Sequence, residues 1–311
     1  MISRSGRGVM ESRLVAKQKG EVVEGQRILA EIGRGAASIV YLVQDQKSKQ
    51  IGALKHVQKH DPKDQRFLDQ AEIEYQIASQ LDHPVMRKIP KRIKKGSLLN
   101  TKELYLLMEL VDGQAMDLLP PKTFEDAVDL FLQVAKGLAH MHERGFVHAD
   151  MKPNNVIVIE GNRAKIIDLG QSCKVGTVKP RIQGTPDYIA PEQVHRREIT
   201  GKTDIYNLGA TMYWVLTRQK IPTALASGDS LVGSIDDNLM EKPRPAMELN
   251  KRIPQRLNDL IMSCVEVNAD LRPRDMRDVA DTLELVLGQI RAAANKSSEN
   301  ASIGKSNPEA V

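Results

Sequence analysis

The pattern of apolar residues changes at Asp112-Gly113, and this change most constrains the fold. Before it, over residues 27–57, short β-branched and apolar runs alternate with glycine-containing turns, which is typical of antiparallel strands. Residues 64–81 have helical spacing, and two more strand-like runs follow at 89–96 and 103–111. After Gly113 the spacing is mainly helical. We therefore predict an α+β, bilobal chain whose first lobe has a five-stranded antiparallel sheet and one main helix, and whose second lobe is mostly helical.

The second half begins with an amphipathic helix over residues 124–143, with Thr123 as its N-cap. Strands are expected at 156–159 and 164–167, a polar loop at 171–186, and helices at 204–217, 254–266 and 275–293. The expected domains are a basic N-terminal extension (1–23), a first lobe (24–111), a second lobe (112–292) and a disordered C-terminal tail (293–311), because the tail has almost no large apolar residue.

Composition excludes several classes of protein. The chain is 41% hydrophobic and 27% charged, and no apolar run is long enough for a membrane helix, so we expect no membrane partner. The two cysteines are far apart, and we expect a reducing, cytoplasmic location. The net charge is +5, but residues 1–20 hold five basic residues and one acidic residue, so we expect no nucleic-acid partner. Six basic residues between Arg87 and Lys95 are interpreted as a solvated hairpin.

A glycine-rich segment, Gly33-Arg34-Gly35-Ala36-Ala37-Ser38, lies between the first two strands. Glycines there would let backbone N–H groups approach phosphate oxygens, although such a segment alone is more often only a turn. A strand follows it, whereas a helix follows the dinucleotide fingerprint, and no Gly-Lys-Ser/Thr closes it as in a P-loop. A lysine that ends the next strand, Lys55, could hold phosphates as a point charge. It would need an anionic partner, and the next helix offers Glu72 and Glu74.

The decisive segment runs from His148 to Asn155 and is followed by Asp168-Leu169-Gly170. Phosphoryl transfer needs a carboxylate to orient the attacking hydroxyl, a cation on the transferred group, and a metal ion to neutralise charge. Asp150, Lys152, Asn155 and Asp168 supply these groups, with oxygen ligands suited to Mg²⁺. A matched set in this order is far more specific than any one of its members.

With these segments in order over about residues 24–290, the sequence resembles the protein kinase superfamily, in its eukaryotic-type (Hanks-type) serine/threonine branch. The resemblance implies transfer of the ATP γ-phosphate to Ser/Thr hydroxyls of protein substrates, with ATP and Mg²⁺ (or Mn²⁺) as cofactors. It also implies that Lys55 binds the α- and β-phosphates and pairs with Glu74, which lies nine residues before His83. Asp150 matches the catalytic base, and Lys152 matches the γ-phosphate lysine.

The other site residues implied by the resemblance fall into three groups. Met108 would be the gatekeeper, residues 109–111 the hinge that meets adenine, and Val40, Ala53 and Ile157 the apolar positions around the adenine ring. The nucleotide-binding residues are Ile32, Gly33, Arg34, Gly35, Ala36, Ala37, Ser38, Val40, Ala53, Lys55, Met108, Glu109, Leu110, Val111 and Ile157. The catalytic residues are Asp150, Lys152, Lys55, Glu74 and Thr185, and the metal ligands are Asn155 and Asp168.

Further matches lie outside the nucleotide site. Residues 184–192 resemble the loop that receives the peptide, with Glu192 expected to pair with Arg272. Residues 204–209 resemble the buried helix that anchors the catalytic loop. The positions of the apolar regulatory spine are Ala78, Ile89, His148 and Leu169, and for His148 we expect this structural role and no proton transfer.

Three departures from the family pattern matter. Ser38 replaces the third glycine, and Leu169 replaces a phenylalanine while still filling an apolar position. Ala149 stands where the family commonly has an arginine that receives a phosphate on the activation loop. We therefore predict that activity does not depend on phosphorylation of Ser172 or Thr177.

Two alternatives remain. A pseudokinase, acting as a scaffold, would normally lack Lys55, Asp150 or Asp168, and all three are present. A small-molecule kinase typically lacks the Lys152-Pro153 pair and the peptide loop. Lys152 and Thr185 together indicate the Ser/Thr class. Ala115 and Asn154 stand where basophilic kinases hold carboxylates, so strong preference for arginine-containing sites is not expected; autophosphorylation is one route of regulation left open.

Overall fold

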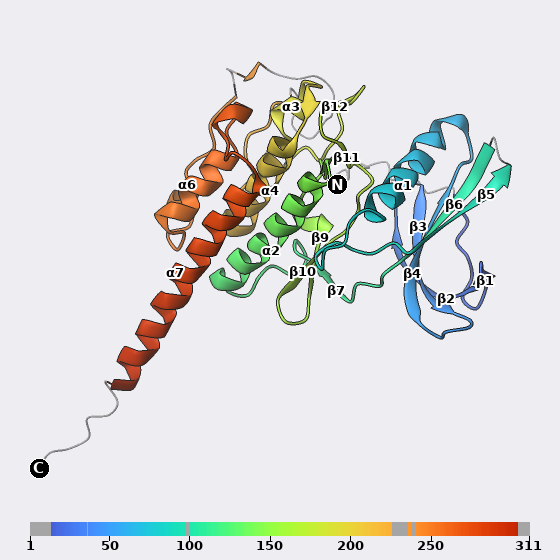
Figure 1. Cartoon of the computed structure of the whole chain (residues 1–311), viewed down its shortest axis with the longest axis horizontal. Helices are drawn as coiled ribbons and strands as arrows, with labels where there is room; N and C mark the ends of the chain where they lie inside the picture. Colours follow the sequence, from blue (N-terminus) through green and yellow to red (C-terminus); the bar gives the residue numbers. More distant parts are fainter. Residues whose placement is uncertain (1–13, 36, 98–99, 226–235, 238–239, 304–311) are drawn as a thin grey trace, which may run out of the picture. The chain divides into compact units, whose positions relative to one another are not determined.

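The computed structural model describes residues 14–35, 37–97, 100–225, 236–237 and 240–303. The chain divides into two compact units. Residues 1–80 and 87–111 make up the first, and residues 81–86 and 112–311 make up the second (Figure 1). Each unit is described separately below.

The first unit is built on one antiparallel sheet with strand order β1-β2-β3-β4-β6-β5. Its strands are β1 (Val22–Val23), β2 (Gln26–Arg34), β3 (Ser38–Asp45), β4 (Ile51–Gln58), β5 (Lys91–Ser97) and β6 (Asn100–Met108). A short 3-10 turn, η1 (Pro62–Asp64), leads into the single main helix α1 (Gln65–Ala78). The predicted five-stranded sheet with one helix is confirmed. The two-residue β1, which pairs with the start of β2, was not predicted.

The pairing register divides the side chains of this sheet between two faces. Val40 lies opposite Lys55, and Ala53 lies opposite Met108, so these four residues share one face. Residues of the other parity, with Tyr41 and Leu54 among them, form a buried cluster on the second face. Because β3 is apolar on both faces, both faces of the sheet need a cover.

The second face is covered by the start of the described chain. Leu14 is 4% exposed and belongs to the same cluster as Tyr41. The N–H of Lys17 donates to Tyr41 Oη at 2.9 Å, and Arg34 Nη1 donates to Leu14 O at 3.3 Å. The sequence predicted a loose extension over residues 1–23, but its described part packs on the sheet. The physical reason is the second apolar face of β3, which would otherwise face water.

The second unit contains the longer helices. They are α2 (Phe124–Glu143), α4 (Gly201–Thr217), α6 (Gln255–Cys264) and α7 (Met276–Ile303), with the short α3 (Pro191–Val194), α5 (Ala246–Leu249) and the 3-10 turns η2 (Pro153–Asn155) and η4 (Ala269–Leu271). Helix α7 packs against α2 and α6. The predicted N-cap of α2 is confirmed: Thr123 Oγ1 accepts from the N–H of Asp126 at 3.0 Å, and the Asp126 carboxylate accepts from the N–H of Thr123 at 3.2 Å.

Two helices extend beyond their predicted bounds. Helix α4 begins at Gly201, before the expected Asp204, because Thr200 caps it: its Oγ1 accepts from the N–H of Lys202 at 3.3 Å. Helix α7 continues to Ile303, into the segment that the sequence predicted to be disordered. Residues 292–294 are three consecutive alanines, the strongest helix formers, which favour this continuation.

Short strands complete the second unit. Strands β9 (Val156–Ile159) and β10 (Arg163–Ile166) form a three-stranded sheet with β7 (Gly113–Ala115). Strand β8 (Phe146–Val147) pairs with β11 (Cys173–Lys174), and β12 (Thr177–Val178) pairs with β13 (Glu198–Ile199). The predicted polar loop at 171–186 therefore contains two strands. They escaped prediction because two-residue strands carry no periodic signal.

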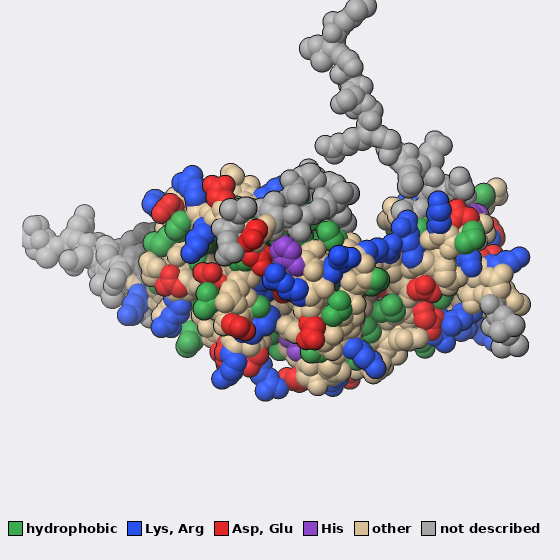
Figure 2. Space-filling view, turned by 90° about the horizontal axis from the view of Figure 1, so that it is seen from above, with side chains coloured by type: hydrophobic (Ala, Val, Ile, Leu, Met, Phe, Trp, Pro, Cys, Tyr) green, Lys and Arg blue, Asp and Glu red, His purple; other side chains and the backbone are tan. Residues whose placement is uncertain are grey.

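The surface is mixed in charge. On the face drawn in Figure 2, basic, acidic and apolar side chains are interspersed. Among the described residues, no helix combines the length and apolar character that crossing a membrane requires.

Candidate active site

The glycine-rich segment is the turn between β2 and β3. Gly33 lies opposite Val40, and the N–H of Gly35 donates to Ser38 O at 2.8 Å. A side chain at Gly35 would come within 3.0 Å of Ser38 Oγ, so the tight turn favours glycine there. Ala37 directly precedes β3, which begins at Ser38, whereas Ala36 lies outside the described residues.

Two members of this segment have exposed side chains. Ile32 is 50% exposed. The guanidinium of Arg34 forms an ion pair with Glu31 at 2.7 Å.

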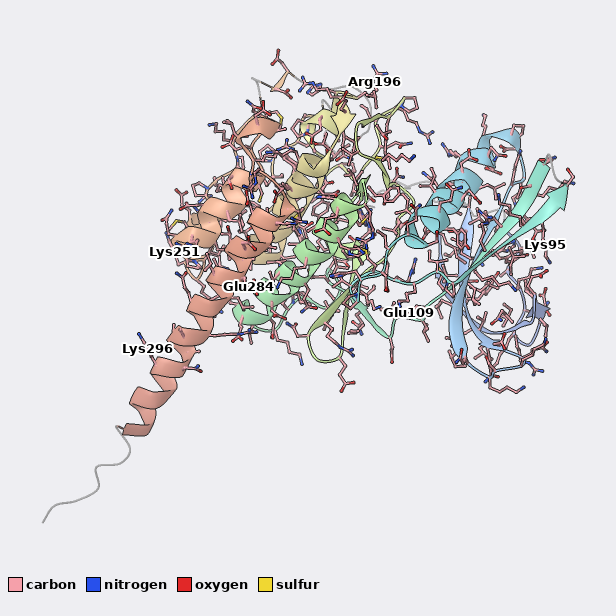
Figure 3. The ribbon with its side chains drawn as sticks, viewed as in Figure 1. Lys95, Glu109, Arg196, Lys251, Glu284 and Lys296 are labelled. Atoms are coloured by element: carbon pink, nitrogen blue, oxygen red, sulfur yellow. The ribbon has the colours of Figure 1, made fainter. Side chains whose placement is uncertain are left out.

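The predicted gatekeeper, Met108, lies on the same face of the sheet as Ala53, and the predicted hinge follows it in the chain. Met108 is 2% exposed and is the last residue of β6. The N–H of Glu109 donates to Lys88 O at 2.9 Å, and the carboxylate of Glu109 accepts from the N–H of Lys88 at 3.0 Å (Figure 3). Leu110 and Val111 come next and end the first unit.

Lys55 projects from this sheet face to a buried glutamate on α1. Its Nζ lies 2.6 Å from Glu74 Oε2, and the Glu74 side chain is 1% exposed. Of the two glutamates that the sequence offered, Glu74 is therefore the partner of Lys55. Glu72 pairs instead with Arg92 and Lys94.

In the second unit, a buried carboxylate anchors the loop that follows β8. Asp204 on α4 is 0% exposed; its Oδ2 accepts from the N–H of His148 and its Oδ1 from the N–H of Ala149, both at 2.8 Å. His142 Nε2 donates to the same carboxylate at 2.8 Å. Burial alone would raise the pKa of Asp204, but His142 and the N–H of His148 hold it below its ordinary value. These bonds hold Ala149 in the left-handed region, at φ 60°.

Three polar side chains meet just beyond this anchor. Asp150 Oδ1 accepts from Thr185 Oγ1 at 2.8 Å, Asp150 Oδ2 accepts from Lys152 Nζ at 2.9 Å, and Lys152 Nζ also donates to Thr185 Oγ1 at 2.7 Å. The carboxylate thus holds a hydroxyl and an ammonium at once. This is the arrangement that an attacking hydroxyl and a transferred phosphoryl group require.

The two predicted metal ligands are neighbours in the same unit. The N–H of Ile167 donates to Asn155 O at 2.9 Å, which brings Asp168 beside Asn155. Asn155 Nδ2 donates to Asp150 O at 2.8 Å, and this bond turns the amide oxygen of Asn155 away from that carbonyl. One amide oxygen and one carboxylate fit Mg²⁺, which typically takes few protein ligands and completes its shell with water and phosphate oxygens.

His148 has the contacts of a structural residue. It is fully buried, and its Nδ1 accepts the N–H of Asp150 at 3.3 Å, so Nε2 carries the proton. Among the described residues Nε2 has no hydrogen-bond partner. All four predicted spine residues are buried within their own units: Ala78, Ile89, His148 and Leu169.

The peptide-loop residues are fixed by a buried ion pair. Arg272 Nη1 and Nη2 donate to the two oxygens of Glu192 at 2.8 and 3.0 Å, which confirms the predicted pair. Thr203 Oγ1 also donates to Glu192, at 2.8 Å. A bidentate pair of this kind holds α3 to the segment before α7.

Sequence reasoning did not identify Gln193 as a connecting residue. Its Nε2 donates to Ala149 O at 2.8 Å and to Gln183 O at 3.1 Å, and its Oε1 accepts from Asn207 Nδ2 at 3.1 Å. Gln193 thereby ties the peptide loop to the catalytic loop and to α4. Its position directly after Glu192 was the only available signal.

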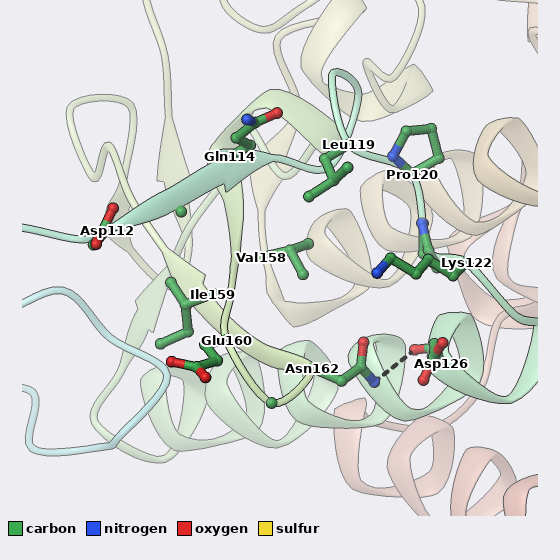
Figure 4. Close-up of a pocket in the computed structure, with 13 residues that line it drawn as sticks. Asp112, Gln114, Leu119, Pro120, Lys122, Asp126, Val158, Ile159, Glu160 and Asn162 are labelled. Atoms are coloured by element: carbon green, nitrogen blue, oxygen red, sulfur yellow. Dashed lines mark hydrogen bonds between the residues drawn. The ribbon is translucent and has the colours of Figure 1, made fainter.

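A separate cavity of about 630 Å³ lies beside β7 and the β9–β10 turn (Figure 4). Leu119 and Val158 line it together with the charged Asp112, Lys122 and Glu160. None of the predicted site residues belongs to its lining, so this cavity is distinct from the candidate active site.

Comparisons with known proteins agree with this geometry. The model of the protein kinase domain family matches residues 27–282. A probable serine/threonine-protein kinase of Clostridium acetobutylicum is 27% identical over 275 residues, which cover 84% of this chain and 39% of that protein. The serine/threonine-protein kinase PrkC of Bacillus subtilis is 28% identical over 255 residues, covering 78% of this chain and 38% of that protein.

An Aurora kinase of the fungus Eremothecium gossypii is 34% identical over 191 residues, or 60% of this chain and 51% of that protein. The chain thus spans about two-fifths to one half of the length of these curated relatives. The family match covers most of the sequence, and it includes the glycine-rich turn, the Lys55–Glu74 pair and the Asp150 loop. The chain therefore belongs to the protein kinase family, in its eukaryotic-type serine/threonine branch.

Proposed function

We propose that this chain is a serine/threonine protein kinase that transfers the γ-phosphate of ATP to hydroxyl groups of protein substrates. The observation that carries the proposal is the contact set of Asp150, Lys152 and Thr185, in which one carboxylate accepts from a hydroxyl and from an ammonium. A substrate hydroxyl at the place of the Thr185 hydroxyl would be oriented for attack.

The substrate oxygen bonds to the γ-phosphorus, the bond from that phosphorus to the bridging oxygen breaks, and ADP leaves with the electron pair. Asp150 accepts the proton of the hydroxyl, and Lys152 stabilises the negative charge of the transferred group. Lys55, fixed by Glu74, would hold the α- and β-phosphates. A Mg²⁺ ion held by Asn155 and Asp168 would neutralise phosphate charge.

The experiment that tests this function is phosphorylation of a positional peptide library by the purified chain with Mg²⁺ and γ-labelled ATP. We expect label on serine and threonine, identified by phosphoamino acid analysis, and no strong selection for arginine before the acceptor. Label on tyrosine, or on a small molecule and no peptide, would contradict the proposal. The library also gives the sequence preference directly.

We further propose that kinase activity needs no phosphate on residues 171–186, which we call the activation segment. Strand β11 pairs with β8, and β12 pairs with β13, so backbone hydrogen bonds hold the segment on both sides. Lys179 Nζ donates to Gln171 O, and burial lowers the pKa of Lys179, although Cys173, Asp150 and Asp204 oppose this lowering.

The two candidate phosphorylation sites differ in access. Ser172 is 3% exposed, and its Oγ donates to His148 O at 3.3 Å, so a kinase could reach it only after the segment moved. Thr177 is half-buried, and its Oγ1 donates to Lys174 O at 2.7 Å. Thr177 is therefore the site at which dependence on phosphate can be tested.

Replacing Thr177 with alanine is expected to leave kcat/KM for peptide within about twofold of the unmodified protein. The change removes one hydrogen bond, typically worth about 1 kcal/mol, at a partly exposed site outside the Asp150 contacts. Steady-state kinetics on proteins of verified mass measure the effect. A loss of activity in Thr177→Ala that Thr177→Glu restores would instead indicate activation by phosphate.

We propose a reducing, cytoplasmic setting for this enzyme. Cys173 and Cys264 are both free thiols. Burial raises the pKa of Cys173 and raises that of Cys264 to about 12, so neither is a ready thiolate. Its partners would be ATP and protein substrates, and autophosphorylation remains a possible regulatory step.

A further inference from the structure

Four of the six basic residues in the run from Arg87 to Lys95 are exposed, as its sequence indicated, but Arg87 and Arg92 are half-buried. Arg87 Nη2 lies 3.0 Å from Glu74 Oε1, Lys94 Nζ lies 3.2 Å from Glu72 Oε2, and Arg92 also pairs with Glu72. Both glutamates lie on α1. Three of the six basic residues, Arg87, Arg92 and Lys94, therefore pair with carboxylates of α1.

Glu74 has a cation on each oxygen. Lys55 Nζ pairs with Glu74 Oε2 at 2.6 Å, and Arg87 Nη2 pairs with Glu74 Oε1 at 3.0 Å. The side chains of Glu74, Arg87 and Lys55 are 1%, 15% and 18% exposed. A carboxylate buried this deeply is stable as an ion only when it is well paired, so the second cation lowers the cost of keeping Glu74 charged.

The two cations come from different directions. Lys55 belongs to β4, whereas Arg87 belongs to the segment between α1 and β5. Because Lys55 and Arg87 bind different oxygens of Glu74, the two contacts complement each other. When Lys55 engages phosphate, Arg87 would still hold Glu74 in place.

Arg92 adds a second anchor on the same helix. Its guanidinium pairs with Glu72 and lies over the Tyr75 ring, 4.8 Å from the ring centroid. Glu72 and Glu74 are two positions apart on α1, so the basic run contacts two positions within one turn of the helix. Such a double contact resists both rotation and outward movement of α1.

We propose that Arg87 is a positioning residue for phosphoryl transfer: through Glu74 it fixes α1 and orients Lys55 toward the nucleotide phosphates. This proposal rests on the proposed kinase function. It also supplies a second reason why activity would not depend on a phosphate in the activation segment, since α1 is held by residues of its own unit.

The first test compares Arg87→Met with the unmodified protein. Methionine keeps an unbranched apolar stem and removes the charge and the hydrogen bond. Because misorientation of a phosphate-binding lysine acts on the transition state, we expect kcat to fall about 10- to 100-fold while KM for peptide stays within about twofold. Arg87→Lys, which keeps a cation but loses the planar fork, should recover part of the lost kcat.

A double-mutant cycle with Glu74→Gln separates positioning from general stability. If Arg87 acts through Glu74, Arg87→Met should lower kcat by less than about twofold in the Glu74→Gln background. Lys95→Met is the matched control: Lys95 belongs to the same basic run and lies on β5 (Figure 3), but it pairs with Glu24 at 3.0 Å. Its kcat should equal that of the unmodified protein.

Hydrogen exchange of residues 65–78 gives a readout that needs no catalysis. Arg87→Met should speed amide exchange of α1 at least about tenfold relative to Lys95→Met, because the helix loses one of its anchors. Failure of the kinase function would show as no transfer by the unmodified protein, with this exchange difference intact. Unchanged kcat in Arg87→Met, an equally large loss in the Glu74→Gln background, or unchanged exchange of α1 would each overturn the proposal.

Discussion

Asp150→Asn is expected to lower kcat for peptide phosphorylation by about 10³-fold, within the range by which a positioned general base accelerates a reaction. The amide keeps the size of the side chain, and its oxygen can still accept one hydrogen bond. It cannot accept the proton of the hydroxyl, and it weakens the contact with Lys152, which now lies 2.9 Å from a carboxylate oxygen. KM for ATP should change little, because Asp150 is assigned to the hydroxyl acceptor.

The control for this variant is Glu284→Gln, the same chemical change on the surface of α7. Glu284 is 61% exposed and pairs with Lys136 at 3.1 Å, so its loss should affect neither kcat nor stability measurably (Figure 3). Activity of Asp150→Asn within about tenfold of the unmodified protein would contradict the assignment of Asp150 as the base.

Asp204→Asn is expected to lower the free energy of unfolding by about 3 kcal/mol and to reduce kcat as well. One amide N–H₂ would replace an oxygen that accepts from a backbone N–H, so that either His148 or Ala149 would lose its partner in a fully buried place. The loop that carries Asp150 would then lose its fixed backbone conformation. Urea unfolding, monitored by fluorescence or circular dichroism, measures the change in the free energy of unfolding.

The same variant has a characteristic pH dependence. The pKa of Asp204 is held below its ordinary value of 3.8, so its charge stabilises the fold above that pH and the contribution is lost as pH falls through the lowered pKa. The unmodified protein and Asp204→Asn should therefore differ in free energy of unfolding by a constant amount near neutral pH. This difference should become smaller below pH 3.8. A difference that widens in acid would contradict the role given to the carboxylate.

Much of the fold could be predicted because its elements are long and periodic. Helix α2 has its predicted bounds and N-cap. Helix α7 was predicted too short because a run of alanines has no amphipathic pattern, although its intrinsic propensity is high. The strands at Cys173–Lys174 and Thr177–Val178 could not be predicted, because their pairing depends on partners distant in sequence.

Much of the candidate site was also accessible to sequence reasoning, because its residues occur at fixed spacings. Lys55 pairs with Glu74, and Asp150 contacts Lys152, as the pattern indicated. What spacing could not reveal are partners contributed by distant segments. His142 and Gln193 support the catalytic loop from other elements, and Arg87 belongs to a basic run that composition alone suggests is solvated.

The packing of the N-terminal segment illustrates the same limit. Residues 1–20 are polar and basic on average, and a single leucine within them, Leu14, is buried against the sheet. The signal for this contact lay in β3, where Ile39, Tyr41 and Val43 form a second apolar face. A strand that is apolar on both faces predicts a cover but does not identify the segment that provides it.

The central claim is that this chain is a serine/threonine kinase that works without a phosphate on its activation segment. Its most direct test is the initial rate at which protein shown by intact mass to carry no phosphate transfers γ-phosphate from Mg-ATP to a serine or threonine peptide. The account predicts a rate that is linear from the first turnover, unchanged after prior incubation with ATP, and abolished by Asp150→Asn. A lag that disappears after phosphorylation of Thr177, or a rate equal to that of Asp150→Asn, would contradict it.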